Sequence, residues 1–180
     1  MADYRLVGAH EMNKWLWSKL KDFEYKAGVK AFADYKDSGN TDGYNIVPII
    51  PGHQWPQMSD ITGNKSPYIV YNYIMSSYSS EWWLCREQCA YVIYDSDEER
   101  LRGIHAYMID LLKRVDWTAR DINNYQSPSN FDFKFVQLTS AAGPDDYAVT
   151  TEKSFQGAMV VVNYEYTTDM STEEGNGMRV

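Results

Sequence analysis

Acidic residues and one histidine are the side chains whose types and spacing could carry out acid–base chemistry in this sequence. Asp95, Asp97, Glu98 and Glu99 form its densest acidic run, and His105 follows them. Two carboxylates can share general acid–base work when burial separates their pKa values. A helix would bring Asp97 or Glu98 within a turn or two of His105. The competing interpretation is structural, because consecutive acids at a helix start commonly cap the helix and complement its dipole.

Histidine and cysteine, the usual ligands of a transition metal, are few in this chain. The three histidines are His10, His53 and His105, and none of them has the His-x-x-x-His spacing of a zinc helix. His105 falls in an apolar helical stripe, where a hydrogen-bonded core histidine is more common than a ligand. The sequence also lacks a Gly-x-Ser-x-Gly elbow, a phosphate-binding loop and a calcium loop. We therefore expect no catalytic residue, no cofactor and no metal.

The two cysteines point to a reducing compartment. Cys85 and Cys89 lie four residues apart in an apolar run typical of a strand. That spacing along a strand is about 13 Å, which is too far for a disulfide. Two free thiols suit the cytosol.

The charge of the chain argues against two classes of partner. Its net charge is −8, whereas a nucleic-acid groove needs clustered Lys and Arg to replace the counterions of phosphate. An anionic membrane surface is disfavoured for the same reason. No apolar run approaches the ~18 residues of a membrane helix, and the N-terminal residues lack the apolar core of a signal peptide. We expect no nucleic-acid recognition, no membrane association, and a protein that stays in the compartment where it is made.

Aromatic residues are unusually numerous, with six Trp and fifteen Tyr. Such side chains fill cores, and they are also enriched at protein interfaces because they are rigid and amphipathic. Residues that do not serve the predicted core become interface candidates, together with polar neighbours in the same loops. These candidates are Trp17, Tyr44, His53, Trp55, Met58, Asp145, Asp146 and Tyr147.

The first part of the chain is predicted to hold one helix and two strands separated by long loops. Apolar residues recur at three- and four-residue steps over residues 12–23, which predicts a helix with Trp17 off its apolar stripe. Residues 26–45 and 51–66 are irregular loops, longer than most connections between packed elements. Residues 46–50 and 67–75 are predicted strands. Pro48 suits an edge position, because proline has no backbone donor.

The second part begins with a long strand over residues 81–94. Trp83, Cys85, Cys89, Tyr91 and Ile93 share one face of it, and Glu87 lies on that same face. Ser96 and Glu99 then form a capping box for a helix whose apolar stripe runs to Val115. A polar connection, residues 116–130, leads to a strand that alternates at Phe131, Phe133 and Phe135. The final predicted strand covers residues 155–166.

These elements predict a single α+β domain over residues 1–167, with the order α-β-β-β-α-β-β. The expected architecture is a two-layer sandwich, in which two helices pack on one face of a mixed, mostly antiparallel sheet. Residues 168–180 have no apolar period and are expected to form a flexible acidic tail.

The order of these elements resembles the tail terminator, or tail-completion, family of tailed bacteriophages. The likeness covers roughly residues 5–167 and is carried by layout. It consists of an N-terminal amphipathic helix, a Pro-bearing strand "IVPIIP", the strand "KSPYIVYNYIMS", a long strand that runs into a capped helix in "CAYVIYDSDEERLRGIHAYMIDLLKRV", the strand "FDFKFVQL", and a Gly-Pro-Asp loop before "FQGAMVVVNYEY".

The resemblance implies a structural role in the virion, after assembly in the host cytoplasm. Members of this family form a ring of six copies on the head-proximal end of the tail tube, where they stop polymerisation and present a surface to the head connector. The implied partners are further copies of the chain, the tail tube protein, the head connector or neck proteins and, in contractile tails, the sheath protein. No catalytic residue is implied.

Three alternatives stay open at this point. The chain could be another connector or neck component of the virion. It could be a small enzyme that uses the acidic run with His105. It could also be an adaptor that binds a host protein through its aromatic loops.

Overall fold

We describe the fold from a computed structural model. The described residues are 8–33, 35, 48–52, 67–78, 84–125, 131–144 and 156–168. The elements in chain order are α1 (Gly8–Leu20), β1 (Glu24–Lys26), β2 (Val29–Lys30), β3 (Ile49–Pro51), β4 (Tyr68–Tyr78), β5 (Leu84–Asp95), α3 (Glu98–Leu112), α4 (Asp116–Tyr125), β6 (Phe131–Ala142) and β7 (Gln156–Thr168).

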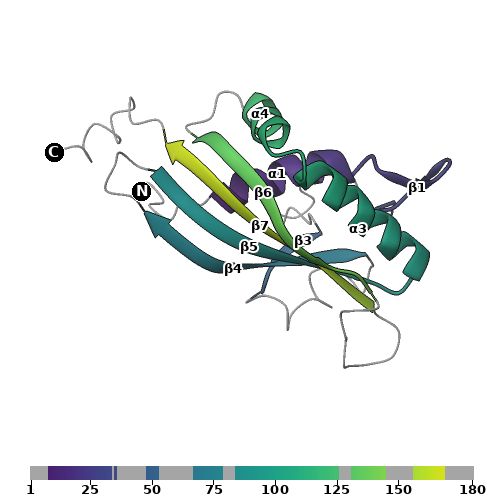
Figure 1. Cartoon of the computed structure of the whole chain (residues 1–180). Helices are drawn as coiled ribbons and strands as arrows, with labels where there is room; N and C mark the ends of the chain where they lie inside the picture. Colours follow the sequence, from purple (N-terminus) through teal and green to yellow (C-terminus); the bar gives the residue numbers. More distant parts are fainter. Residues whose placement is uncertain are drawn as a thin grey trace, which may run out of the picture.

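One five-stranded sheet forms the centre of the molecule, with the strand order β3-β4-β5-β7-β6. β3 runs parallel to β4, and the other neighbours are antiparallel. Helices α1, α3 and α4 lie on one side of this sheet (Figure 1). The predicted α+β sandwich with a mixed, mostly antiparallel sheet is therefore confirmed, although three described helices take the place of the expected two.

The core lies between this sheet and the helices. On β5, Cys85, Cys89, Tyr91 and Ile93 are all buried in it, as the alternation of the sequence predicts. β7 is the antiparallel neighbour of β5, so its even-numbered residues from Ala158 to Tyr166 face the same way. The helices contribute their apolar stripes, which include Trp15 and Leu16 from α1 and Ile104 and Met108 from α3.

Helix α4 was not predicted, because residues 116–130 read as a polar connection. Its buried stripe is short and consists of Thr118, Ala119 and Ile122, of which only Ile122 is a large apolar side chain. Val115 separates α3 from α4 with a φ of 38°, a backbone conformation that β-branched residues rarely adopt. Across this break the Thr118 hydroxyl donates to the Leu111 carbonyl oxygen at 2.5 Å. The end of α3 therefore keeps a hydrogen-bond partner although the chain changes direction.

The region after α1 also differs from its prediction. α1 ends at Leu20, so Phe23 lies outside the helix, where its ring stacks on Tyr107 with centroids 4.3 Å apart. Strands β1 and β2 then form a small antiparallel hairpin at the start of the expected loop over residues 26–45. Gly28 makes the turn of this hairpin with a φ of 77°, which glycine adopts without steric cost. The rest of that loop, apart from a few residues up to Tyr35, lies outside the described residues, as do nearly all of 51–66 and the expected tail.

Helix α3 begins one residue later than the capping box predicts. Its N-cap is Asp97, whose carboxylate accepts from the Arg100 amide at 3.2 Å. Glu99, the other half of the predicted box, pairs with Lys26 at 3.0 Å. The acidic run still starts the helix, but the capping group is an aspartate and Ser96 precedes it.

Candidate functional site

Strand β5 carries two buried carboxylates, one near each end of its helix-facing side. Glu87 is 2% exposed and Asp95 is 0% exposed. A buried carboxylate is costly unless it is paired or hydrogen-bonded, so its partners indicate what the site does. These two groups are the strongest candidates for chemistry among the described residues.

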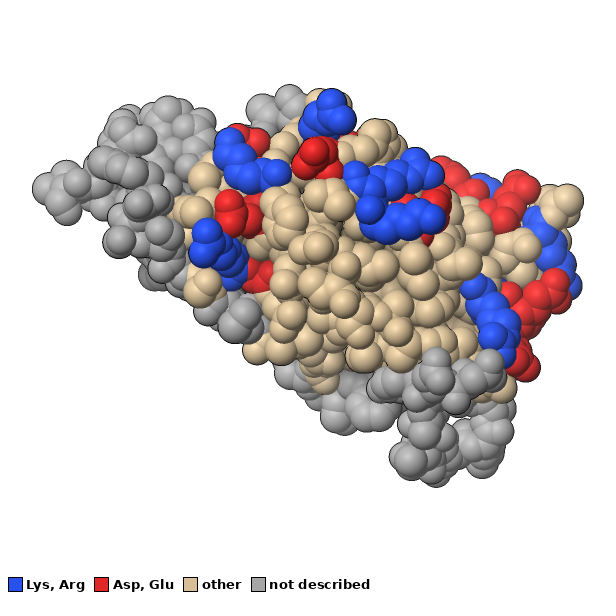
Figure 2. Space-filling model, viewed as in Figure 1, with Lys and Arg blue, Asp and Glu red and all other residues tan. Residues whose placement is uncertain are grey.

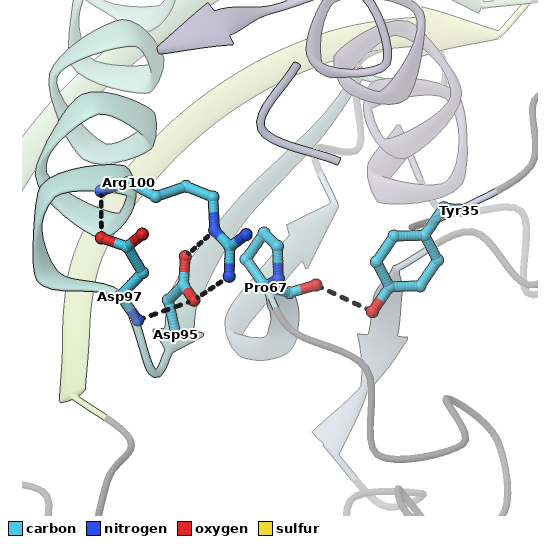
Figure 3. A network of polar contacts seen from close by, with 5 residues as sticks. All are labelled: Tyr35, Pro67, Asp95, Asp97 and Arg100. Carbon is cyan, nitrogen blue, oxygen red and sulfur yellow. Dashed lines mark hydrogen bonds and ion pairs between the residues drawn. The ribbon is translucent and has the colours of Figure 1, made fainter. Parts of the chain in front are cut away.

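Asp95 is neutralised by a cation from the following helix. Its two carboxylate oxygens accept from Nε and Nη2 of Arg100, both at 2.6 Å, and Oδ1 also accepts from the Asp97 amide at 3.1 Å. Figure 3 shows how this fork closes the corner between β5 and α3. The hydrogen bonds to Asp95 raise the pKa of Arg100 further above its usual value. All partners lie within five residues of Asp95, so the arrangement fixes a local turn.

Figure 3 also shows a second contact close to this corner. The Tyr35 hydroxyl donates to the carbonyl oxygen of Pro67 at 2.8 Å, immediately before β4 begins. The bond ties residue 35 to the start of that strand. The role of this tyrosine is therefore also to hold the fold.

Glu87 is satisfied without a cation among its described partners. Its Oε2 accepts from the Tyr164 hydroxyl at 2.5 Å, while its Oε1 accepts from the Tyr166 hydroxyl and from the Gly8 amide, the latter at 3.3 Å. Gly8 opens α1, so the carboxylate lies at the positive end of that helix dipole. The site joins a central strand, its neighbour β7 and the first helix, and we call these four residues the Glu87 cluster.

The tyrosines of the Glu87 cluster are protonated donors. Burial raises the pKa of both phenols well above the ordinary value, and the negative charge of Glu87 acts in the same direction. Both rings also pack on Phe133, at centroid distances of 6.0 and 5.5 Å. A proton cannot leave either hydroxyl at neutral pH, so the cluster is suited to holding elements together and poorly suited to acid–base turnover.

Gly8 has no space for a side chain. A Cβ atom built on it would lie 2.5 Å from Cε1 of the Tyr166 ring, closer than real Cβ contacts. The absence of a side chain lets the helix start approach the sheet closely enough for its amide to reach Glu87. The contact between α1 and β5 therefore depends both on the Glu87 carboxylate and on the absence of a side chain at residue 8.

The two cysteines flank Glu87 on the same face of β5 and are both free thiols. Burial raises the pKa of Cys89 to about 12 and also raises the pKa of Cys85. The thiolate is the reactive form of cysteine, so these side chains act as small core residues at neutral pH.

The acidic run and His105 are not brought together in the described structure. Glu98 pairs with Arg102 at 2.7 Å on the exposed side of α3, while Asp95 and Asp97 serve the corner. Nε2 of His105 lies 3.1 Å from the Met159 carbonyl oxygen on β7. Each group of the predicted acid–base set thus contacts a different structural partner.

Of the predicted interface candidates, only Trp17 belongs to the described residues. It is half-buried, and its ring meets Phe32 edge to face at 5.6 Å. Trp17 lies off the main apolar stripe of α1, as predicted. Its contact with Phe32, however, is a contact within this chain. Tyr44, His53, Trp55, Met58, Asp145, Asp146 and Tyr147 fall outside the described residues.

An exposed tryptophan on α4 was not anticipated. Trp117 is 37% exposed, and the cations of Arg114 and Lys19 lie 4.8 and 5.9 Å from its ring. Lys19 also pairs with Asp121, which accepts from the indole of Trp15 at 2.8 Å. On the face seen in Figure 2, Lys and Arg lie beside Asp and Glu, so no patch of one sign dominates it.

Two further observations concern the described residues alone. No group of three or more His, Cys, Asp or Glu among them is placed to hold a metal ion. None of their helices has the length and apolar character needed to cross a membrane.

No model of a known protein family matches the chain, and no curated protein matches it.

Proposed function

We propose that this chain is a structural protein of a tailed bacteriophage, a tail terminator that assembles as a ring on the head-proximal end of the tail tube. The ring, six-fold in the family that the sequence resembles, ends tube growth and offers a surface for head joining. Other copies of the chain, the tube protein and the head connector are the proposed partners, with the sheath protein added in a contractile tail.

The order of elements carries this proposal. A helix precedes a Pro-bearing strand, a long strand runs directly into a capped helix, and two late strands follow. This is the layout on which the resemblance rests. The described structure keeps that order, and it adds α4 and the β1–β2 hairpin at the periphery.

The use of the polar groups gives a second line of support. The buried carboxylates of Glu87 and Asp95 bind groups of the same subunit and so join its elements. His105 contacts the backbone of β7, and both buried thiols have raised pKa values. These described buried groups serve the fold, which favours a function exerted through the surface, as an assembly role requires.

The test uses tail tubes that polymerise in the presence or absence of the purified protein. We expect tubes that stop growing at a defined length and carry ring-shaped density at one end in electron micrographs. A protein that stays monomeric and leaves the tubes overlong would contradict the proposal. Tubes of normal length that are already capped, yet fail to join heads without this protein, would assign it to the connector instead.

A matched control separates assembly from catalysis. Glu98 pairs with Arg102 on the exposed side of α3, so Glu98→Gln removes one surface ion pair and leaves the core intact. We expect this variant to cap tubes as the natural sequence does. Loss of capping with an intact fold would show that the acidic run takes part in the function.

A further inference from the structure

The exposed ring of Trp117 lies among positive charges where three helices meet. Trp117 belongs to α4 and is 37% exposed. The Lys19 cation of α1 and the Arg114 guanidinium, which follows α3, lie 5.9 and 4.8 Å from its ring centroid. Arg120 is exposed and lies one helical turn after Trp117, so the two side chains are neighbours. We call Lys19, Arg114, Trp117 and Arg120 the Trp117 surface.

Two carboxylates on the neighbouring helices pair with three cations at or beside this surface. Asp121 binds Lys19 at 2.8 Å. Asp110 is shared, because it pairs with Arg114 at 2.6 Å and with Lys113 at 3.3 Å. The acid at position 110 therefore balances only one of the two cations that it contacts.

Arg120 has no carboxylate partner among the described residues. Its Nε donates instead to the carbonyl oxygen of Asp116 at 3.4 Å. Four cations and three carboxylates lie in this region, namely Lys19, Lys113, Arg114 and Arg120 with Asp110, Asp116 and Asp121. The region thus has one positive charge in excess, in a chain whose net charge is −8.

Nearly all of the net negative charge lies outside the described residues. The described residues contain 12 Lys and Arg and 13 Asp and Glu, out of 17 and 25 in the whole chain. The other residues therefore contain 5 cations and 12 acids, a net charge of −7. One of their acidic segments is residues 169–180, with Asp169, Glu173 and Glu174 against Arg179.

This segment begins close to α4. Thr168, the last residue of β7, pairs with Phe131, and two residues later the Phe133 backbone bonds to the Asn123 side chain of α4 at 2.8 and 2.9 Å. Figure 1 shows α4 at this end of the sheet. From Asn123 to Trp117 the helix axis covers about 9 Å. The twelve residues after Thr168 can span up to about 40 Å, so they reach the Trp117 surface with length to spare.

Two other acidic segments are attached at the opposite end of the sheet. Residues 145–155 join β6 to β7 beyond the pair Ala142 and Met159, the far end of a strand about 40 Å long. Residues 36–47 lie between Tyr35, which bonds to Pro67 before β4, and β3, which pairs with the start of β4. Residues 169–180 start nearer to α4 than either of these segments.

We propose that residues 169–180 dock on the Trp117 surface of their own chain. Glu173 and Glu174 supply carboxylates to Arg120 and Arg114, and Met178 follows them as a contact for the exposed indole, since thioethers pack favourably on aromatic rings. A partner protein that binds the Trp117 surface must then displace this segment. The contact does not depend on the proposed role as a tail terminator.

Covalent attachment compensates for the weakness of the individual contacts. Exposed ion pairs contribute little each, and salt screens them. A segment joined to its site by a short linker, however, has an effective concentration of the order of 1 mM. A docking contact with a Kd of about 1 mM is therefore half occupied within a single chain, while two separate chains at micromolar concentration do not form it.

A spin label on the segment measures this contact in the full chain. The label is attached to M178C, and Cys85 and Cys89 do not react because both thiols are buried with raised pKa values. The tryptophans are replaced by 5-fluorotryptophan, and the signal that W117F lacks is that of Trp117. We expect the label to broaden this fluorine signal, and about 0.5 M salt to reverse most of the broadening.

The charge of the segment is tested against a matched control. Glu173→Gln with Glu174→Gln should reduce the broadening at least about threefold, because two ion pairs are lost. Glu98→Gln with Glu99→Gln removes the same charge from the exposed side of α3 and should leave the broadening unchanged. Equal broadening in the two double variants would overturn the proposal, as would a Trp117 signal that the label does not affect.

Mixed samples decide between the same chain and a second copy. Fluorinated protein without the label is mixed with labelled protein without fluorine, at the total concentration of the first experiment. We expect no broadening of the Trp117 signal in this mixture. Broadening as strong as in the doubly labelled chain would assign the segment to a neighbouring copy and overturn docking within the chain.

Discussion

Glu87 and Asp95 lie on the same face of the same strand, eight residues apart, and their burial is compensated in different ways. Asp95 is paired with the guanidinium of Arg100 and with groups no more than five residues away. Glu87 has no described cation, and its donors come from 77 to 79 residues away in sequence. The first carboxylate fixes a corner between consecutive elements. The second joins the first helix to the strands β5 and β7, so it belongs to the tertiary structure.

The largest expected effect is the loss of the Glu87 carboxylate. Glu87→Ala leaves two buried hydroxyls and the Gly8 amide without an acceptor and opens a cavity, which should cost about 3–5 kcal/mol of unfolding free energy. Urea unfolding measures this cost. Hydrogen exchange should show α1 as the element that loses most protection. A cost below about 1 kcal/mol would remove the tertiary role assigned to Glu87.

Asp95→Asn is expected to have the next largest effect. It leaves the Arg100 guanidinium, whose side chain is 18% exposed, beside a neutral amide, and should cost about 2–4 kcal/mol because breaking a buried pair strands a charge. Loss of hydrogen-exchange protection should be confined to the first turn of α3. Arg100→Met in the same background should recover part of the loss, since the stranded charge is gone. Loss of hydrogen-exchange protection in α1 as well would contradict the local role assigned to Asp95.

Alkaline pH should destabilise the region around Glu87 in particular, because the buried Cys89 thiol lies on the same strand face. The pKa of this thiol is about 12 in the folded protein and about 9 as a free side chain. The unfolded chain loses this proton first, so the stabilisation is complete below pH 9 and declines as pH rises toward 12. Between pH 9 and 10.5 this thiol removes up to about 2 kcal/mol. The buried tyrosine phenols act in the same direction above their ordinary value.

Thermal unfolding at pH 8 and 10.5 measures this decline, and Cys89→Ala is the matched control. The control should show a shallower decline than the natural sequence, because the Cys89 thiol no longer contributes to it. Identical slopes would mean that the thiol is more hydrated than its burial indicates.

The smallest effect is expected at the local corner. Asp97→Ala removes the N-cap of α3, whose carboxylate accepts from the Arg100 amide, and should cost about 1 kcal/mol. Asp97→Asn keeps an acceptor at the cap and should cost less. Chemical unfolding of the two variants side by side decides this. A cost equal to that of D95N would mean that the cap and the ion pair act as a single unit.

Local pattern allowed the sequence to predict the sheet and two helices. The alternation along β5 placed its buried face correctly and put Glu87 on it. An acid on an apolar strand face was the available signal for the cluster. Its donors lie on α1 and β7, and no short-range pattern connects those elements to β5, so the cluster itself could not be predicted. Helix α4 was not predicted, because its buried face consists of Thr118, Ala119 and Ile122 and so contains one large apolar side chain.

The acidic run and His105 illustrate a related limit of sequence patterns. Helical spacing brings Glu98 and His105 within reach in principle, but partners elsewhere decide the direction of each side chain. Arg102 draws Glu98 to the surface, and the β7 backbone holds the ring of His105. The ion pair between Asp95 and Arg100 could not be predicted, because it depends on the conformation of the turn before α3. Most of the interface candidates lie outside the described residues and stay predictions.

The position of β7 has a consequence for protein synthesis. This strand leaves the ribosome after both of its neighbours, and it fits between β5 and β6. Until it arrives, β6 has no described strand to pair with, so β6 cannot join the sheet while residues 156–168 are still being made. A chain that stops before residue 156 therefore lacks the strand that joins β5 to β6 in the described sheet.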